Sequence, residues 1–231
     1  VRSQLKAKAE ESSIRYFRRS LRCLMLQRPL GSATVLAIDP GFKQGCKCAV
    51  LSPSGSVLAT DKFFLHQGKE RVSQAVAAVV RKHGVTKIVI GNGTGGRETE
   101  DVVCECVRDH KLTVQRSPTS NSSSADSSAS PVEFCIASKV ANEELGGMDI
   151  LFRGAVSIGR RIQDPMSELV KIPPQSIGVG MYQHDISEKT LAKALTDETV
   201  SAVASVGVNV NTASTYVLRC VPGITAKLAD S

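Results

Sequence analysis

The chain of 231 residues is long enough for one large domain, or for a medium domain with smaller segments beside it. Its 42% hydrophobic and 22% charged residues are typical of a globular protein with a buried core, and no apolar run reaches the roughly 18–20 residues that span a bilayer. We therefore predict no membrane partner, and the absence of Trp argues against a base-stacking platform of the RRM or OB type.

The net charge of +7 is concentrated at the N-terminus. Residues 1–30 hold eight basic residues against two acids, which accounts for +6 of the total. Apolar residues recur there at helical spacing, so we predict a basic helical segment over residues 1–32. Two interpretations remain open, a solvated face on a docking helix and an electrostatic footprint for phosphates.

Cysteine usage and the polar N-terminus both predict an intracellular protein, without distinguishing nucleus from cytoplasm. The seven cysteines are odd in number, and the first residues contain no apolar segment of a secretory signal. Two CxC pairs, Cys46/Cys48 and Cys104/Cys106, resemble zinc ligands, but no further Cys or His lies close by in the sequence. The favoured interpretation is that these cysteines are buried and pack as small apolar side chains.

From residue 33 the pattern changes to short strands and helices. TVLAIDPG predicts a strand that ends in a turn, and CKCAVLSPSG and SVLATDKFFL predict a hairpin. A helix over residues 69–83, the strand and glycine loop KIVIGNGTGG, the helix RETEDVVCECVRDH and a fifth strand KLTVQ follow. This order predicts an α/β fold with a mixed five-stranded sheet and flanking helices.

The second half of the chain is predicted to be helical after a low-complexity loop. Residues 117–131 are mostly Ser, which predicts a flexible loop. Helical patterns follow at residues 138–145, 151–170, 187–206 and 211–220. A proline inside the second of these predicts that the helix restarts near Asp164.

Asp39 is the most informative candidate for chemistry. It ends the first strand, where an open α/β sheet presents ligands, and in RNase H-like folds such an aspartate begins a carboxylate cluster that holds two Mg²⁺ ions. An Asp before Pro-Gly is also a common way to begin a turn, which is the alternative interpretation of Asp39.

The segment that begins at Gly91 matches the GxGxxG pattern of dinucleotide-binding loops. It follows the fourth predicted strand instead of the first, so it is weak evidence for a dinucleotide site. The N-terminus of the helix that follows, beside Arg97, would suit a phosphate.

The string SIGRRIQDPMSELVKI is the densest polar helical stretch. Asp164 either caps a helix or supplies a second carboxylate to Asp39. Arg160 and Arg161 either form surface salt bridges or contact backbone phosphates.

Five segments together closely resemble, in order, the central region of the Tex family of transcription accessory proteins: VLAIDPG, IGNGTGGRETE, SIGRRIQDPMSELVKI, IGVGMYQHD and VGVNVNTAS. The resemblance includes eukaryotic relatives that carry an S1 RNA-binding domain, and it covers nearly all of residues 10–228. It implies that residues 33–172 form a YqgF domain, an RNase H-like fold related to the RuvC resolvase. It also implies that residues 173–231 begin a truncated helix-hairpin-helix region, and that the protein binds nucleic acid in transcription or RNA metabolism.

The resemblance also implies an incomplete nuclease site. Asp39 matches the first-strand aspartate and Asp164 the helix aspartate, but the strand that ends in Glu in active RuvC-like enzymes ends here in Gly91-Asn92. Glu98 and Glu100 lie further on, in the predicted helix. The Glu-Ala-Gly-Ala-Ser string usual in Tex-type chains is replaced by the Ser-rich stretch. A two-metal centre without its carboxylates loses metal affinity and the positioning of water.

We therefore predict a non-catalytic RNase H-like module with no cofactor, whose vestigial candidates are Asp39, Glu98 and Asp164. It contacts the RNA or DNA backbone without sequence specificity, and its partners include transcription or RNA-processing machinery. The predicted phosphate-contacting residues are Arg15, Arg18, Arg19, Arg97, Arg160 and Arg161. Two alternatives stay open: a Mg²⁺- or Mn²⁺-dependent nuclease using Asp39, Asp164 and Glu98 or Glu100, and a scaffold that orients neighbouring domains.

Overall fold

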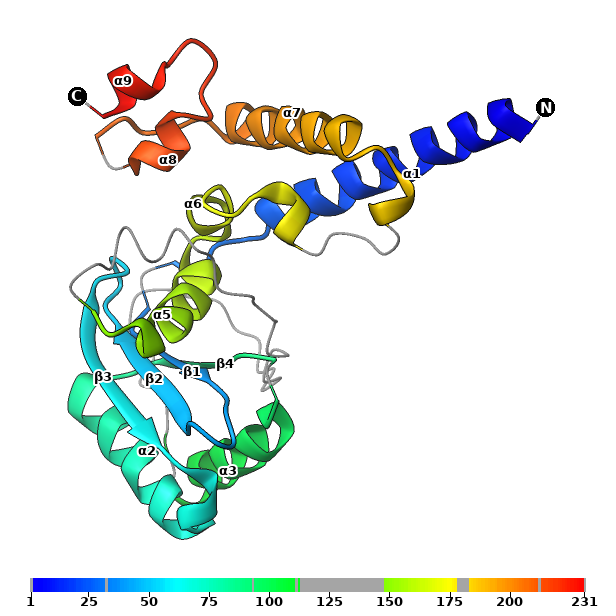
Figure 1. Cartoon of the computed structure of the whole chain (residues 1–231). Helices are drawn as coiled ribbons and strands as arrows, with labels where there is room; N and C mark the ends of the chain where they lie inside the picture. The colour runs from blue at the N-terminus through cyan, green and yellow to red at the C-terminus, as the bar shows by residue number, and fades with distance from the viewer. Residues whose placement is uncertain are drawn as a thin grey trace, which may run out of the picture. The chain divides into compact units, whose positions relative to one another are not determined.

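The computed structural model describes residues 2–31, 33–92, 94–110, 112, 148–177, 183–211 and 213–230. The chain divides into two compact units (Figure 1). Residues 30–163 form the sheet unit, and residues 1–29 together with 164–231 form the helical unit. None of the described helices is long and apolar enough to cross a membrane.

A mixed sheet forms the centre of the sheet unit. Its strands are β1 (Val35–Asp39), β2 (Cys46–Leu51), β3 (Val57–Phe63) and β4 (Lys87–Ile90), in the order β3-β2-β1-β4. β2 is antiparallel to both β1 and β3, whereas β4 is parallel to β1. The predicted α/β fold with a mixed sheet is confirmed and is consistent with an RNase H-like fold. The described residues contain four strands instead of five, because the predicted strand over 111–115 lies outside them apart from Leu112.

Helices cover both faces of this sheet (Figure 1). The helices are α2 (Lys69–His83), α3 (Gly96–Asp109) and α5 (Ile150–Gln163), and a short 3₁₀ helix spans Leu65–Gln67. Because neighbouring strand residues point to opposite faces, Leu36 and Ile38 pack in the core formed with α2 and α3. Val35 and Ala37 pack in the core formed with α5. β1 is therefore apolar on both faces, as expected for a strand between two helical layers.

α5 lies close to the sheet, and its C-terminal end is tied to the start of β1. The side-chain amide of Gln163 donates to the carbonyl oxygens of Ala33 at 2.9 Å and Ser52 at 2.8 Å. A Cβ atom at Gly159 would lie 2.5 Å from Cδ1 of Leu51 and 3.0 Å from Cβ of Ala37. The missing side chain at Gly159 is thus what permits this close helix-sheet packing.

Alanine at Gly159 tests this packing, because two effects of opposite sign compete there. Helix propensity alone favours alanine by about 1 kcal/mol, but the added methyl group collides with the sheet. We expect Gly159→Ala to lower the free energy of unfolding by a net amount of about 1–3 kcal/mol, measured by urea denaturation followed by circular dichroism. A gain in stability would contradict the packing.

The helical unit joins the two ends of the chain. Its helices are α1 (Arg2–Met25), α6 (Pro165–Leu169), α7 (Glu188–Val206), α8 (Thr215–Leu218) and α9 (Ala226–Ala229), with 3₁₀ helices at Pro174–Ile177 and Gln183–Asp185. α1 lies beside α7 (Figure 1), and Phe17 and Leu21 share a core with Leu191 and Leu195. The basic N-terminal helix is confirmed. The predicted helix over 138–145 lies outside the described residues, and that over 211–220 is described as a helix only at Thr215–Leu218.

The unit boundary differs from the sequence-based one. The sequence separates residues 1–32, 33–172 and 173–231, whereas the sheet unit ends at Gln163. The reason is that the helix predicted over 151–170 breaks at Asp164, and Leu169 and Ile172 beyond the break join the core that contains α1 and α7. Residues 164–172 therefore pack with the N-terminal helix.

An ionic clamp joins α1 to α7 within the helical unit. The carboxylate of Glu198 accepts from Nε of Arg18 at 2.9 Å and from Nη1 of Arg22 at 3.1 Å, and Arg22 also donates to the hydroxyl of Ser201. The Glu198 side chain is 9% exposed, so it depends on these two arginines for its hydrogen bonds.

The clamp is tested by neutralising its buried carboxylate. We expect Glu198→Gln to lower the free energy of unfolding by about 1.5–3 kcal/mol, because charge-assisted hydrogen bonds of a buried group are lost. The matched control is Glu11→Gln, whose partner Arg15 lies at the same 3.1 Å while both side chains are more than 70% exposed. This control should change stability by about 0.5 kcal/mol or less in urea denaturation, and equal losses in the two variants would refute the role of burial.

Candidate nucleic-acid interface

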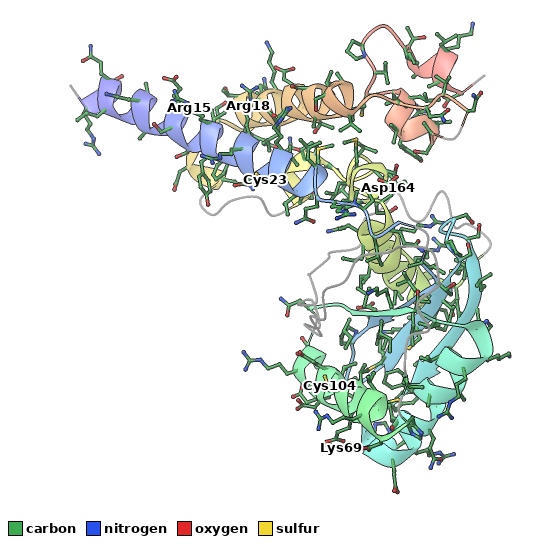
Figure 2. The ribbon with its side chains drawn as sticks, turned by 180° about the vertical axis from the view of Figure 1, so that it is seen from behind. Arg15, Arg18, Cys23, Lys69, Cys104 and Asp164 are labelled. Carbon is green, nitrogen blue, oxygen red and sulfur yellow. The ribbon has the colours of Figure 1, made fainter. Side chains whose placement is uncertain are left out.

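The exposed side of α1 carries several basic side chains, of which some are paired with acids and others are not (Figure 2). Arg15 pairs with Glu11 at 3.1 Å, and Lys6 pairs with Glu10 at 3.6 Å. Exposed pairs of this kind contribute little stability and exchange readily for another anion. Arg19 is exposed and, among the residues that the structure describes, makes no hydrogen bond or ion pair.

Lys8, Arg15 and Arg19 lie on one face of α1. Their spacing of seven and then four residues returns to nearly the same side of an α-helix. All three are exposed, and Lys8 also lacks a partner within the described part of the chain. We call Lys8, Arg15 and Arg19 the α1 basic face.

Arg18 has a different role from its neighbour Arg19. Its Nε atom is hydrogen-bonded to Glu198, although 46% of its side chain remains exposed. The sequence predicts Arg18 as a phosphate contact with no sign of this buried acid, which lies 180 residues away. The structure makes Arg18 part of the α1–α7 clamp.

Arg160 and Arg161, the two arginines of α5 that the sequence predicts as phosphate contacts, are half-buried instead of fully exposed. Nε of Arg160 donates to the carbonyl oxygen of Gly55 at 3.0 Å, which ties α5 to the turn between β2 and β3. Arg161 is also only partly exposed. Both side chains contribute less free cationic surface than the sequence predicts.

Arg97 lies at the first turn of α3 and is exposed, with no hydrogen bond or ion pair among the described residues. The other exposed charged residues of α3 are four acids, Glu98, Glu100, Asp101 and Asp109, and one further cation, Arg108, in the last turn. The acids outnumber the cations, so most of this surface repels phosphate. Glu98 and Glu100 are exposed carboxylates on this helix and are not drawn into a buried site.

Asp39 is the last residue of β1 and lies directly opposite Lys47 of β2. Desolvation raises the pKa of the half-buried Asp39 carboxyl, and the positive charge of Lys47 acts in the opposite direction. Lys47 is only 9% exposed. A lysine thus lies on the neighbouring strand opposite the aspartate that the sequence predicts as the first ligand of a metal cluster.

Asp164 caps α6 in the helical unit (Figure 2). Its carboxylate accepts from the backbone N–H of Ser167 at 3.0 Å and from the Ser167 hydroxyl at 2.6 Å. These bonds satisfy an otherwise unpaired donor of the first turn. Of the two predicted interpretations of Asp164, the structure thus shows helix capping. Asp39 belongs to the other unit.

Sequence reasoning missed Asp149, which immediately precedes α5. Because the C-terminal end of α5 is tied to the start of β1, its N-terminal end points toward the edge where β1 ends. The Asp149 carboxylate accepts from the backbone N–H of Leu151 at 3.1 Å. The direction of the helix could have identified Asp149 from the sequence. A helix antiparallel to β1 brings its first residues, and not its last, to the edge of the sheet where Asp39 lies.

The described residues do not fit a two-metal centre. Among them, no group of three or more His, Cys, Asp or Glu side chains is placed to hold a metal ion. Lys47 opposite Asp39 also places a positive charge where a cation would bind. The six described cysteines are free thiols, and Cys46, Cys48 and Cys106 are buried.

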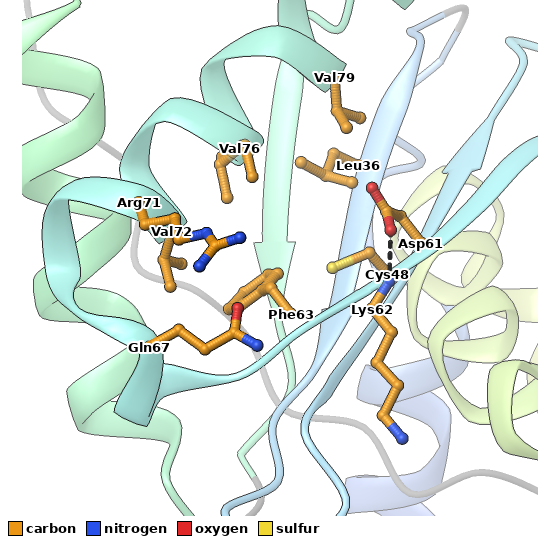
Figure 3. Close-up of a pocket in the computed structure, with 11 residues that line it drawn as sticks. Leu36, Cys48, Asp61, Lys62, Phe63, Gln67, Arg71, Val72, Val76 and Val79 are labelled. Carbon is orange, nitrogen blue, oxygen red and sulfur yellow. Dashed lines mark hydrogen bonds between the residues drawn. The ribbon is translucent and has the colours of Figure 1, made fainter.

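A small pocket lies between α2 and the sheet (Figure 3). Its volume is about 130 Å³, below the roughly 300 Å³ at which small-molecule sites begin. Asp61, Gln67 and Arg71 are among its polar lining residues, and Leu36 and Val76 are among its apolar ones. The dashed line in Figure 3 is the bond from the backbone N–H of Lys62 to the Asp61 carboxylate. We assign no ligand to this pocket.

Comparison with known proteins agrees with the resemblance noted in the sequence. Residues 33–163 match the family model described as Tex protein YqgF-like domain. The chain is 40% identical to human S1 RNA-binding domain-containing protein 1 over 100% of its own length and 23% of the relative's. It is also 40% identical to the transcriptional accessory protein Tex of Neisseria gonorrhoeae, over 99% of this chain and 29% of that protein. The identity to the protein tex of Bordetella pertussis is likewise 40%, over 99% of this chain and 28% of that protein. The chain thus spans less than a third of the length of these relatives.

The raised pKa of Asp39 has a consequence for stability. The folded state binds the Asp39 proton more tightly than the unfolded chain, whose pKa is near 3.8, so stability is lost as pH rises through the folded pKa. Asn carries no charge at any pH. We therefore expect the stability advantage of Asp39→Asn over the unchanged chain to be larger near about pH 7 than near about pH 3, in urea denaturation. An advantage that shrinks as the pH rises would contradict the desolvation of Asp39.

Proposed function

The chain belongs to the Tex family, and on that premise we propose that it is a non-catalytic module that binds the sugar-phosphate backbone of nucleic acids. Relatives are named for transcription and for S1 RNA-binding domains, which supports a nucleic-acid-related function. We extend the proposal to an intracellular protein that works beside transcription or RNA-processing machinery.

The observation that carries the proposal is the α1 basic face, formed by Lys8, Arg15 and Arg19. Residues 1–30 hold nearly the whole net charge of the chain. Arginine and lysine on one exposed helix face attract phosphates regardless of base sequence. Arg97 adds one cation on the sheet unit, whereas Arg18 and Arg160 act first as structural braces. Arg161 is only partly exposed, so it is a weaker candidate for a phosphate contact.

We propose a non-catalytic module because of the side chains that surround Asp39, which would have to bind the metal ions. In-line hydrolysis with two metal ions requires several carboxylates around both ions. Here the nearest cross-strand neighbour of Asp39 is Lys47, and Asp164 is engaged in capping α6. The direction of α5 brings the Asp149 carboxylate toward the Asp39 edge, but no group of three metal-binding side chains forms among the described residues.

Salt dependence tests the proposal. We expect the 231-residue chain to bind a single-stranded RNA in fluorescence anisotropy, with an affinity that falls steeply as salt increases and hardly depends on sequence. The double variant Lys8→Gln/Arg19→Gln should weaken binding by about tenfold and reduce the slope of log K against log salt by about 1.4, because two phosphate contacts are lost.

The matched control is Lys189→Gln/Lys193→Gln, which removes two exposed lysines from α7 of the same unit. This control should retain binding close to that of the unchanged chain. A chain that binds neither RNA nor DNA at low salt would support the scaffold alternative instead. Equal losses in the two double variants would show that only total charge matters, not the α1 basic face.

A further inference from the structure

Lys47 is a buried cation that has no partner among the described residues. It lies in β2 and is only 9% exposed. Within the described part of the chain it makes no hydrogen bond and no ion pair. Lysine is rarely buried unless its charge is paired, because removing an ammonium group from water is costly. The ammonium nitrogen of Lys47 is not among the fully buried, unpartnered side-chain atoms of the described residues.

The surroundings of the ammonium group are shaped by glycines. A Cβ atom at Gly41 would lie 3.4 Å from Nζ of Lys47 and 2.9 Å from the carbonyl oxygen of Gly45. Any side chain at Gly41 would therefore fill the space in front of the ammonium group. The turn that follows β1 thus passes directly beside the ammonium group and places no side chain there at position 41.

A second loop meets this turn at the same edge. A Cβ atom at Gly91 would lie 3.3 Å from Cδ of Pro40, and one at Gly95 would lie 3.3 Å from the ring of Phe42. Phe42 is 47% exposed, and the exposed Lys43 follows it. The edge beside Lys47 therefore carries the exposed side chains of Phe42 and Lys43, and the buried Gly91 and Gly95 let the second loop pack against this turn.

Asp39 narrows the class of ligand. It is the direct cross-strand neighbour of Lys47, yet no ion pair joins them, so each charged group has hydrogen-bonding capacity left over. A plain anion at Lys47 would be repelled by the Asp39 carboxylate, as would the carboxylate of an acidic peptide. A ligand that presents an anion next to a hydroxyl donor satisfies both groups. RNA repeats that combination at every nucleotide, whereas DNA lacks the 2′-hydroxyl.

We propose that Lys47 binds a phosphate of an RNA backbone while Asp39 accepts a hydrogen bond from the adjacent ribose 2′-hydroxyl. This inference rests on the proposed function and deepens it. The α1 basic face attracts any nucleic acid, and the Asp39–Lys47 site prefers RNA over DNA. The ammonium group would hold the strand by its charge and would not activate water for cleavage.

The test compares a single-stranded RNA and a DNA of the same sequence by fluorescence anisotropy at one salt concentration. Lys47→Met should weaken RNA binding by about tenfold and reduce the salt slope by about 0.7, as expected for one lost phosphate contact. Asp39→Ala should weaken RNA binding while DNA binding stays equal or improves, because the 2′-hydroxyl loses its acceptor and the repulsion disappears. Lys47→Arg keeps the charge and should keep most of the RNA binding.

The control is Lys87→Met, which removes an exposed lysine at the start of β4, the opposite edge of the sheet. Circular dichroism of each variant establishes that the sheet unit is folded. If the unchanged chain binds RNA but Lys47→Met binds it equally well, this inference fails and the proposed function stands. Equal affinity of the unchanged chain for RNA and DNA also overturns it. A chain that binds neither nucleic acid overturns both.

Discussion

The burial of β1 between two layers of helices is the constraint on which the sheet unit depends. Leu36 and Ile38 fill one core and Val35 and Ala37 the other, so each inward position of the strand must be apolar. Only the last residue, Asp39, escapes this requirement, because it lies where the strand leaves the sheet. The same burial requires Gly159, whose missing side chain lets α5 lie against β1 and β2. The chemistry of the unit is thereby confined to one edge.

Burial also divides the arginines into two functional groups. Arg15 and Arg22 both lie 3.1 Å from a glutamate oxygen, but Glu11 is exposed and Glu198 is buried. In the exposed pair water competes for both groups, so the arginine remains available to another anion. In the buried pair the carboxylate has no alternative donor, so the arginines are held in the fold. One basic helix thus supplies both a structural clamp and the exposed α1 basic face.

At one edge of the sheet, the carboxylate that ends β1 lies opposite a lysine on the neighbouring strand. A carboxylate at the end of β1 is destabilised by desolvation, and in a nuclease metal ions would relieve that cost. Here the neighbouring positive charge belongs to Lys47, a permanent part of the chain. A lysine attracts an anion by its charge, but unlike a bound metal ion it does not activate water.

The sequence by itself determined the local structure. Apolar periodicity predicted β1, β2, β3 and α2 closely, and the proline after Asp164 predicted the break between α5 and α6, because these features depend on neighbours within a few residues. It also determined the family, through long distinctive strings. Tertiary structure alone decided that Arg18 meets Glu198, that residues 164–172 pack with α1, and that Lys47 faces Asp39. These contacts join residues that are distant in sequence or lie in adjacent strands, and neither composition nor periodicity encodes which side chains a fold brings face to face.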